Sequence, residues 1–151
     1  MNKFIENARH LILWGSISLY ALCLFLPAFT FDKYPPTFGK TLLGLGWFGI
    51  LEGEFGWYAN PLYPVALLLF AKRHFLMSGI LAAFVFGIAL TSLQTKKWWV
   101  NSAVGSYPIG GYGYGFYSWL FSFAVLFIGA FILARVSFRT PPSSGGEDSN
   151  V

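Results

Sequence analysis

The chain has 151 residues, of which 56% are hydrophobic, 21% are aromatic and only 11% are charged. An average soluble domain carries roughly 25% charged residues. Ten basic and six acidic side chains cannot cover the surface of a water-soluble domain of this length, so the composition excludes that class. The same hydrophobic content excludes disorder over most of the chain.

The charges are confined to short clusters that separate long apolar runs. A helix needs roughly 20 mainly apolar residues to cross about 30 Å of hydrocarbon. Four runs reach or approach this length, so the sequence predicts an all-α membrane protein, a four-transmembrane-helix bundle in one domain over residues 1–136. The predicted spans cover residues 11–31, 55–71, 75–95 and 116–136.

The first apolar run follows Lys3 and Arg9, as the core of a signal peptide would. It is longer than the roughly 7 to 15 residues of such a core, and no small-residue cleavage pattern follows it. We therefore interpret it as an uncleaved helix that ends at the sequence FDKYPP. Cys23, the single cysteine of the chain, lies within it and is interpreted as a buried apolar residue.

The second span has two possible starts because Pro61 and Pro64 lie near its beginning. Asn60 could cap a short helix, or the helix could begin near Phe55 and kink. The kinked helix fits the thickness of a bilayer better. Lys72, Arg73 and His74 then form a tight turn, so the second and third spans are predicted to be antiparallel neighbours.

The distribution of lysine and arginine predicts the orientation, because these residues are enriched in cytoplasmic loops. With a cytoplasmic amino end, six basic residues lie inside (Lys3, Arg9, Lys72, Arg73, Arg135, Arg139) and four lie outside (Lys33, Lys40, Lys96, Lys97). The prediction is a bacterial inner (plasma) membrane protein with both termini cytoplasmic and a disordered cytoplasmic tail over residues 137–151. Topology then explains the net charge of +4, and no nucleic-acid partner is expected.

The first outer loop contains an unusually apolar segment over residues 42–56. On a helix its four glycines, Gly46, Gly49, Gly53 and Gly56, would share one face. That pattern favours a re-entrant or interfacial helix packed on the bundle. A winding loop remains the alternative, because four glycines also make a chain irregular.

Small residues recur every fourth position in the third span, at Gly79, Ala83, Gly87 and Thr91. Such a ladder lets two helices approach closely in a membrane, where lipid supplies no hydrophobic drive for their association. We predict a helix-packing face here. The pattern leaves open whether its partner belongs to the same chain or to a second copy.

Aromatic residues are concentrated on the predicted outer side. Six of them, Trp57, Tyr58, Trp98, Trp99, Tyr112 and Tyr114, are candidates for a surface that binds a partner protein, a lipid headgroup or a ring compound. The alternative is an aromatic belt that only anchors the protein in lipid. A belt alone would be expected at both faces, whereas these residues are concentrated at one.

Glu52 is the candidate coupling residue of a transport site, should it point into the bundle. Otherwise Glu52 and Glu54 are solvated or paired with Lys40 or with Lys96 and Lys97. His10 and His74 lie at span ends, where lipid headgroup contact is a simpler role than haem ligation. No catalytic, dinucleotide or metal-binding motif is recognised.

We therefore expect a non-enzymatic accessory or scaffold subunit, without a cofactor, that lies in the lipid bilayer and packs with itself or with a larger membrane complex. The alternative is a small transporter or channel for an uncharged solute or a lipid-like molecule, because proline-broken helices often line binding sites.

Overall fold

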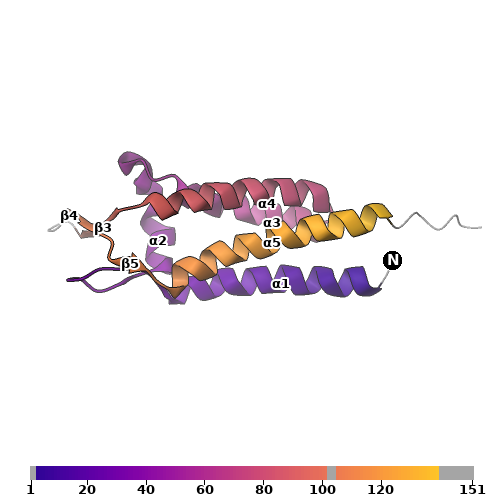
Figure 1. Cartoon of the computed structure of the whole chain (residues 1–151), viewed down its shortest axis with the longest axis horizontal. Coiled ribbons are helices and arrows are strands. Elements are labelled where there is room, and N and C mark those ends of the chain that lie inside the picture. Colours follow the sequence, from indigo (N-terminus) through magenta and orange to yellow (C-terminus); the bar gives the residue numbers. More distant parts are fainter. Residues whose placement is uncertain (1–2, 102–104, 140–151) are drawn as a thin grey trace, which may run out of the picture.

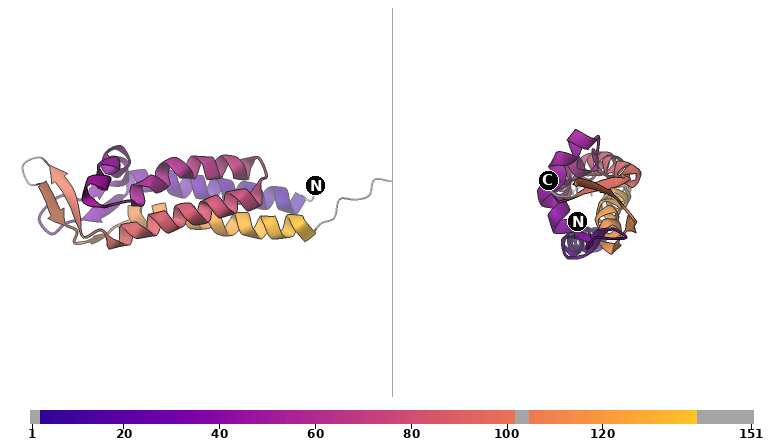
Figure 2. Two further views of the ribbon diagram at one scale, coloured as in Figure 1. Left: turned by 90° about the horizontal axis from the view of Figure 1, so that it is seen from above. Right: turned by 90° about the vertical axis from the view of Figure 1, so that its left-hand side faces the viewer.

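The structure is a computed structural model that describes residues 3–101 and 105–139, and it is mostly helical. Helices α1 (Lys3–Phe25), α3 (Ala59–Ala71), α4 (Phe75–Leu90) and α5 (Tyr114–Arg139) run side by side along the long axis (Figure 1). All the strands gather at one end, which we call the sheet end. The other end, the turn end, holds the start of α1, the turn between α3 and α4, and the end of α5 (Figure 2).

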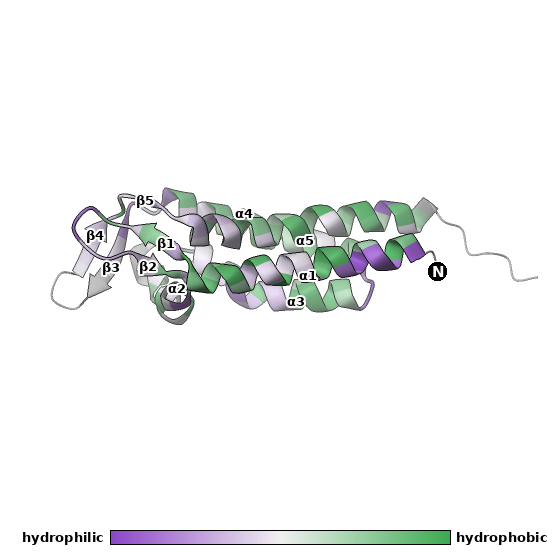
Figure 3. Ribbon diagram, turned by 90° about the horizontal axis from the view of Figure 1, so that it is seen from below, coloured by the Kyte–Doolittle hydropathy of each residue, from purple (hydrophilic) through white to green (hydrophobic). Residues whose placement is uncertain are grey.

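Among the residues that the structure describes, three helices are long and apolar enough to cross a membrane. They are Lys3–Phe25, Phe75–Gln94, which joins α4 to the 3-10 helix η3 (Thr91–Gln94), and Tyr114–Phe138. Large apolar side chains cover their outer faces: Leu11, Phe84 and Phe121 are each at least 60% exposed. In Figure 3 the ribbons of these helices have the colour of hydrophobic residues over much of their length, as expected for helices surrounded by lipid.

Helix α3 has 13 residues and is therefore only about 20 Å long at 1.5 Å per residue. It ends at Ala71, and α4 begins at Phe75, so the two helices are connected by a turn of three residues. The short turn makes α3 an antiparallel neighbour of α4, and α5 lies between α4 and α1. Besides Gly79, the buried residues of α4 recur every three or four positions: Phe75, Ser78, Ala82, Val85 and Ala89.

The sheet end contains two small sheets, whereas the sequence predicted an all-helical protein. Strand β1 (Pro27–Thr30) pairs with β2 (Thr37–Phe38) and with β5 (Gly111–Tyr112), and all pairings are antiparallel. Strands β3 (Lys97–Asn101) and β4 (Gly105–Pro108) form a separate antiparallel pair. The segment before α5, predicted as loop, therefore contributes three strands.

The first and the last helix begin and end at residues other than those predicted. Helix α1 covers residues 3–25 rather than 11–31, because Pro27 cannot continue the helical hydrogen bonds and Phe29 pairs with Tyr112 in the sheet. Helix α5 continues to Arg139, so the predicted tail cannot begin at residue 137. The rest of that tail lies outside the described residues.

The apolar segment near residues 42–56 is not one continuous helix. Helix α2 (Gly39–Leu45) is followed by the 3-10 helix η1 (Gly46–Glu52). Gly53 caps the end of η1 and has a left-handed φ of 79°. A second 3-10 helix, η2 (Gly56–Tyr58), leads into α3. Because the number of residues per turn changes at Gly46, the four glycines do not share one face.

Candidate functional site

A pocket lies at the sheet end, where α1, α3 and α5 meet α2, β1, β3 and η3. Its free volume is about 70 Å³. Its walls are mainly apolar and include six aromatic side chains: Tyr20, Phe29, Trp57, Trp98, Phe116 and Trp119. We call this the aromatic pocket. Its polar lining side chains include Glu54, Asn60, Ser92 and Thr95.

Glycines bring the walls of the aromatic pocket together. A methyl group on Gly46 would overlap the indole ring of Trp57, and one on Gly56 would overlap the hydroxyl of Ser92. A methyl group on Gly115 would lie 2.6 Å from the carbonyl oxygen of Leu26. Any larger residue at these positions would push the elements apart, so the pocket depends on these three glycines.

Asn60 organises the floor of the aromatic pocket. Its side-chain oxygen accepts hydrogen bonds from the Tyr20 hydroxyl at 3.0 Å and from the Trp119 indole N–H at 2.8 Å. Its amide nitrogen donates to the carbonyl oxygen of Trp57 at 2.9 Å. The Trp57 indole N–H in turn donates to the carbonyl oxygen of Leu43. One amide thereby fixes three aromatic lining residues from three different elements.

A second polar cluster lies beneath this floor, deeper between the helices. The hydroxyls of Ser16 and Tyr63 are 2.6 Å apart, and Ser16 donates to the carbonyl oxygen of Ser122 at 2.8 Å. The Tyr63 ring also stacks on Tyr20 at a centroid distance of 4.9 Å. Ser16, Tyr63, Ser122 and the neighbouring Phe123 are buried, so side chains fill the space below the pocket.

Glu54 brings a carboxylate to the wall of the aromatic pocket. Thr95, which is 5% exposed, donates its hydroxyl hydrogen bond to Glu54. In the part of the chain that the structure describes, no ion pair joins Glu54 to a lysine, so the lysine pair, one of the two alternatives for this residue, is not found. The side chain of Glu52, the predicted coupling residue, is not among those that the structure describes.

Tyr112 of β5 is hydrogen-bonded to the segment that contains Ser92 and Thr95. Its hydroxyl lies 3.0 to 3.3 Å from the backbone carbonyl oxygens of Ser92, Leu93 and Thr95. Burial raises the pKa of this hydroxyl, and the nearby Glu54 carboxylate acts in the same direction. The hydroxyl therefore stays a neutral hydrogen-bond donor that ties β5 to η3.

The six predicted aromatic candidates lie in different surroundings. Trp57 and Trp98 line the aromatic pocket, and Tyr112 holds the strands to η3. Trp99 and Tyr114 are exposed, whereas Tyr58 is half-buried beside Trp57.

The four small residues of the predicted helix-packing face also differ in their surroundings. Gly79 is buried, and a side chain there would meet the ring of Phe131 of α5 at 3.2 Å. Ala83 is half-buried. Gly87 and Thr91 are exposed, and no atom of this chain lies near the side-chain position of Gly87. The first member of the ladder thus packs within the chain, and the last two face outward.

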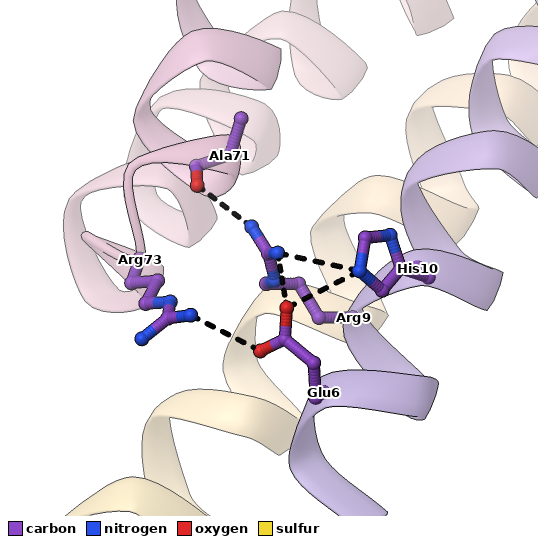
Figure 4. Close-up of polar contacts among 5 residues, drawn as sticks. All are labelled: Glu6, Arg9, His10, Ala71 and Arg73. Atoms are coloured by element: carbon purple, nitrogen blue, oxygen red, sulfur yellow. Dashed lines mark hydrogen bonds and ion pairs between the residues drawn. The ribbon is translucent and has the colours of Figure 1, made fainter. Parts of the chain in front are cut away.

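The turn end carries a charged cluster between α1 and the turn after α3 (Figure 4). Glu6 pairs with Arg9, lies 3.2 Å from His10 and 3.3 Å from Arg73. Arg9 also donates to the carbonyl oxygen of Ala71 at 2.8 Å, which satisfies a terminal carbonyl of α3. The cluster therefore joins α1 to α3 at the end opposite the pocket.

Three residues that form the floor of the pocket were not among the candidates predicted from the sequence: Tyr20, Asn60 and Trp119. Asn60 was interpreted as a possible helix cap, yet α3 begins one residue earlier, at Ala59. An amide in an otherwise apolar segment was the available signal, because buried polar groups in membranes are usually paired or functional. No signal in the sequence brings Tyr20 or Trp119 to that amide.

The lining of the aromatic pocket offers extended aromatic surface, one carboxylate and a few neutral polar groups. Across residues 3–101 and 105–139, no three histidine, cysteine, aspartate or glutamate residues form a group that could hold a metal ion. Neither a model of a known protein family, nor a curated protein, nor a solved structure matches this chain.

Proposed function

We propose that this chain is a non-enzymatic accessory protein of a bacterial inner membrane that binds a small amphipathic molecule in the aromatic pocket. The observation that carries the proposal is the pocket itself. Ligand sites typically combine apolar and aromatic walls with a few placed polar groups, and Asn60, Glu54 and Thr95 supply those groups here.

The proposed topology has four crossings and places both termini in the cytoplasm. Helices α1, α4 and α5 supply three crossings, and residues 56–71 of η2 and α3 supply a shorter fourth, about 24 Å long at 1.5 Å per residue. Short spans are accommodated by local thinning of the bilayer. The basic residues of the turn end then face the cytoplasm.

Helix α2 and η1 are proposed to lie in the outer interface of the membrane. Their side chains Leu45, Trp47, Phe48 and Ile50 are exposed in this chain, and such apolar and aromatic side chains favour the boundary between headgroups and acyl chains. The aromatic pocket would then lie near the outer leaflet, within reach of lipids and of solutes that partition into it.

Labelling of single cysteines tests the topology. In a Cys23→Ala background, Lys33→Cys is expected to react with a membrane-impermeant maleimide in intact cells, because residue 33 would lie outside. Lys72→Cys is expected to react only after permeabilisation. Both lysines are exposed, so access to the reagent depends on the side of the membrane. Labelling of residue 72 in intact cells would overturn the proposed orientation.

Ligand binding is tested with a neutral amphipathic probe. We expect 3,3-dimethylbutan-1-ol to change the tryptophan fluorescence of the detergent-purified protein in a saturable way, because three tryptophans line the pocket. Ala28→Leu adds side-chain volume to the lining and is expected to abolish the response. Ala21→Leu, at an exposed position of α1, is the matched control. A full response in folded Ala28→Leu would contradict the proposal.

Transport is the weaker alternative. The lining of the pocket ends at Tyr20, Asn60 and Trp119, and the buried cluster of Ser16, Tyr63 and Ser122 fills the space below them. This arrangement supports binding at one end of the molecule rather than passage through it.

Self-association is a second proposed property, supported by a different observation. Gly87 of α4 and Thr91 of η3 are exposed, as is Phe84 of α4. Small residues on an outward face allow a second helix to approach closely in lipid. We propose that a second copy of this chain, or a helix of a larger membrane complex, packs there.

A further inference from the structure

The aromatic pocket has charged lining side chains of one sign. Among the described residues that line it, Glu54 carries the only ionisable carboxyl group, and no lysine, arginine or histidine accompanies it. Three indole rings, from Trp57, Trp98 and Trp119, line the same space. The pocket therefore combines negative charge with several aromatic faces and contains no balancing positive side chain.

Aromatic faces attract cations because the π system of each ring has a negative face, and tryptophan has the strongest effect. Recognition of methylated ammonium groups by aromatic cages uses this attraction. A carboxylate in the same cage adds direct attraction between opposite charges, which is stronger where water is partly excluded.

The position of Glu54 suits this role. Thr95 occupies one acceptor site of the carboxylate, and a carboxylate has about four such sites. The bond from Thr95 fixes the orientation of Glu54 while leaving acceptor capacity for a guest. Since Thr95 is itself buried, the pair belongs to the built wall of the pocket.

The size of the pocket limits the guest to a small group. A cavity of roughly 150 Å³ holds a benzene molecule, and the aromatic pocket has about 70 Å³. A trimethylammonium head has about the volume of benzene, so part of it would remain at the mouth of the pocket, and any longer chain attached to it would have to remain outside.

We propose that the aromatic pocket binds a substituted ammonium group through Glu54 and the three surrounding indole rings. The proposal rests on the pocket binding proposed above and specifies its ligand chemistry. The group can come from a free organic amine or from the headgroup of a phospholipid. In both cases the positive charge lies among the rings, and the apolar substituents contact the pocket walls.

The test compares choline with its neutral isostere 3,3-dimethylbutan-1-ol, using tryptophan fluorescence of the full chain in a neutral maltoside detergent at fixed ionic strength. Choline is expected to bind at least tenfold more tightly than the alcohol. Glu54→Gln keeps the shape of the side chain and an oxygen that can accept from Thr95. It is expected to remove the preference for choline, so that choline and the alcohol bind to the variant with affinities within about twofold of each other.

Asp32→Asn is the matched control, because Asp32 is an exposed carboxylate outside the pocket lining. This variant is expected to keep the preference for choline. Equal binding of choline and the alcohol, unchanged by Glu54→Gln, would overturn the ammonium assignment and leave the proposed pocket function standing. Failure of both probes to bind would overturn the pocket function as well.

Bilayers of two compositions distinguish the two sources of the group. In phosphatidylcholine nanodiscs a headgroup ligand would occupy the pocket, so choline titrations would shift to higher concentration than in nanodiscs of an uncharged galactosyl diacylglycerol, which has no ammonium group and no surface charge that attracts choline. Identical titrations in the two bilayers would assign the site to a free amine instead.

Discussion

The hydroxyl oxygens of Ser16 and Tyr63 lie 2.6 Å apart in the interior, where α1, α3 and α5 meet. Ser16 donates its single hydroxyl hydrogen to the carbonyl oxygen of Ser122, so Tyr63 must donate to Ser16. This chain of two hydrogen bonds links three helices, and it supports the floor of the aromatic pocket because Tyr63 also stacks on Tyr20.

Removal of the two hydroxyls is expected to have unequal effects. Tyr63→Phe keeps the ring and leaves Ser16 bonded to Ser122, so the free energy of unfolding should fall by about 0.5–1.5 kcal/mol. Ser16→Val leaves a buried tyrosine hydroxyl without its acceptor, and should cost about 1–3 kcal/mol. Unfolding by sodium dodecyl sulfate in mixed micelles measures both changes. Ser18→Val, at an exposed position of the same helix, is the control, and a larger loss in Tyr63→Phe than in Ser16→Val would contradict this account.

Two glycines of α2 are expected to respond in opposite ways to alanine. A methyl group on Gly39 would overlap the backbone carbonyl of Cys23, which cannot move without displacing the end of α1. Gly44 has open space at its side-chain position. Gly39→Ala should therefore destabilise the protein by about 1–3 kcal/mol, whereas Gly44→Ala should be neutral or stabilise it by up to about 1 kcal/mol. Thermal unfolding in detergent measures the difference, and equal melting temperatures would refute the close approach of α2 to α1.

Arg9 is expected to protect the carboxyl end of α3. Its guanidinium donates to the carbonyl oxygen of Ala71 and pairs with Glu6, as Figure 4 shows. In Arg9→Met the turn that follows α3 should open more often, and exchange of the backbone amide hydrogens at Lys72 and His74 should accelerate about tenfold. That factor corresponds to roughly 1.4 kcal/mol, the lower range for hydrogen bonds to charged groups.

The control for Arg9→Met is Lys3→Met, which removes the same charge from the same end of α1. Lys3 is exposed and lies farther along α1 from the turn. Its replacement should leave amide exchange at the turn unchanged. Acceleration of similar size in both variants would indicate that net charge, rather than the bond to Ala71, stabilises the turn.

Replacement of Gly79 by leucine and replacement of Gly87 by leucine are expected to change two different properties: the stability of the monomer and the association of copies. Gly79→Leu should destabilise the monomer, because the added side chain meets the ring of Phe131. Gly87→Leu should leave monomer stability unchanged and weaken association, since its side chain would point away from the rest of the chain. Light scattering in detergent gives the mass of the assembly, and chemical unfolding gives the stability. An unchanged mass in Gly87→Leu would remove α4 as the contact between copies.

The sequence by itself determined the class of protein and the main helices. Uncharged runs of about 20 residues predict membrane helices because the free energy of transfer into lipid adds up residue by residue along the chain. No knowledge of tertiary contacts is needed for that sum. The same local information located the turn at residues 72–74, where three polar residues interrupt two apolar runs.

Local information was insufficient at the sheet end. Residues 27–30 are apolar enough to extend a helix, yet they form β1 because Phe29 finds a partner in Tyr112, far along the chain. The glycines near residue 46 presented a helical spacing, whereas their actual role is to let Trp57 and Ser92 approach the backbone. Strand pairing and close approach both depend on distant residues.

Only the tertiary structure decided which side chains form the aromatic pocket. Tyr20, Asn60 and Trp119 come from three different helices and meet at one hydrogen-bonded amide. Glu54 lines the wall of the pocket, and no pattern in the sequence predicted this. The physical reason is that hydropathy fixes how deep a residue lies in the membrane, whereas the direction of its side chain depends on how the helices pack against one another.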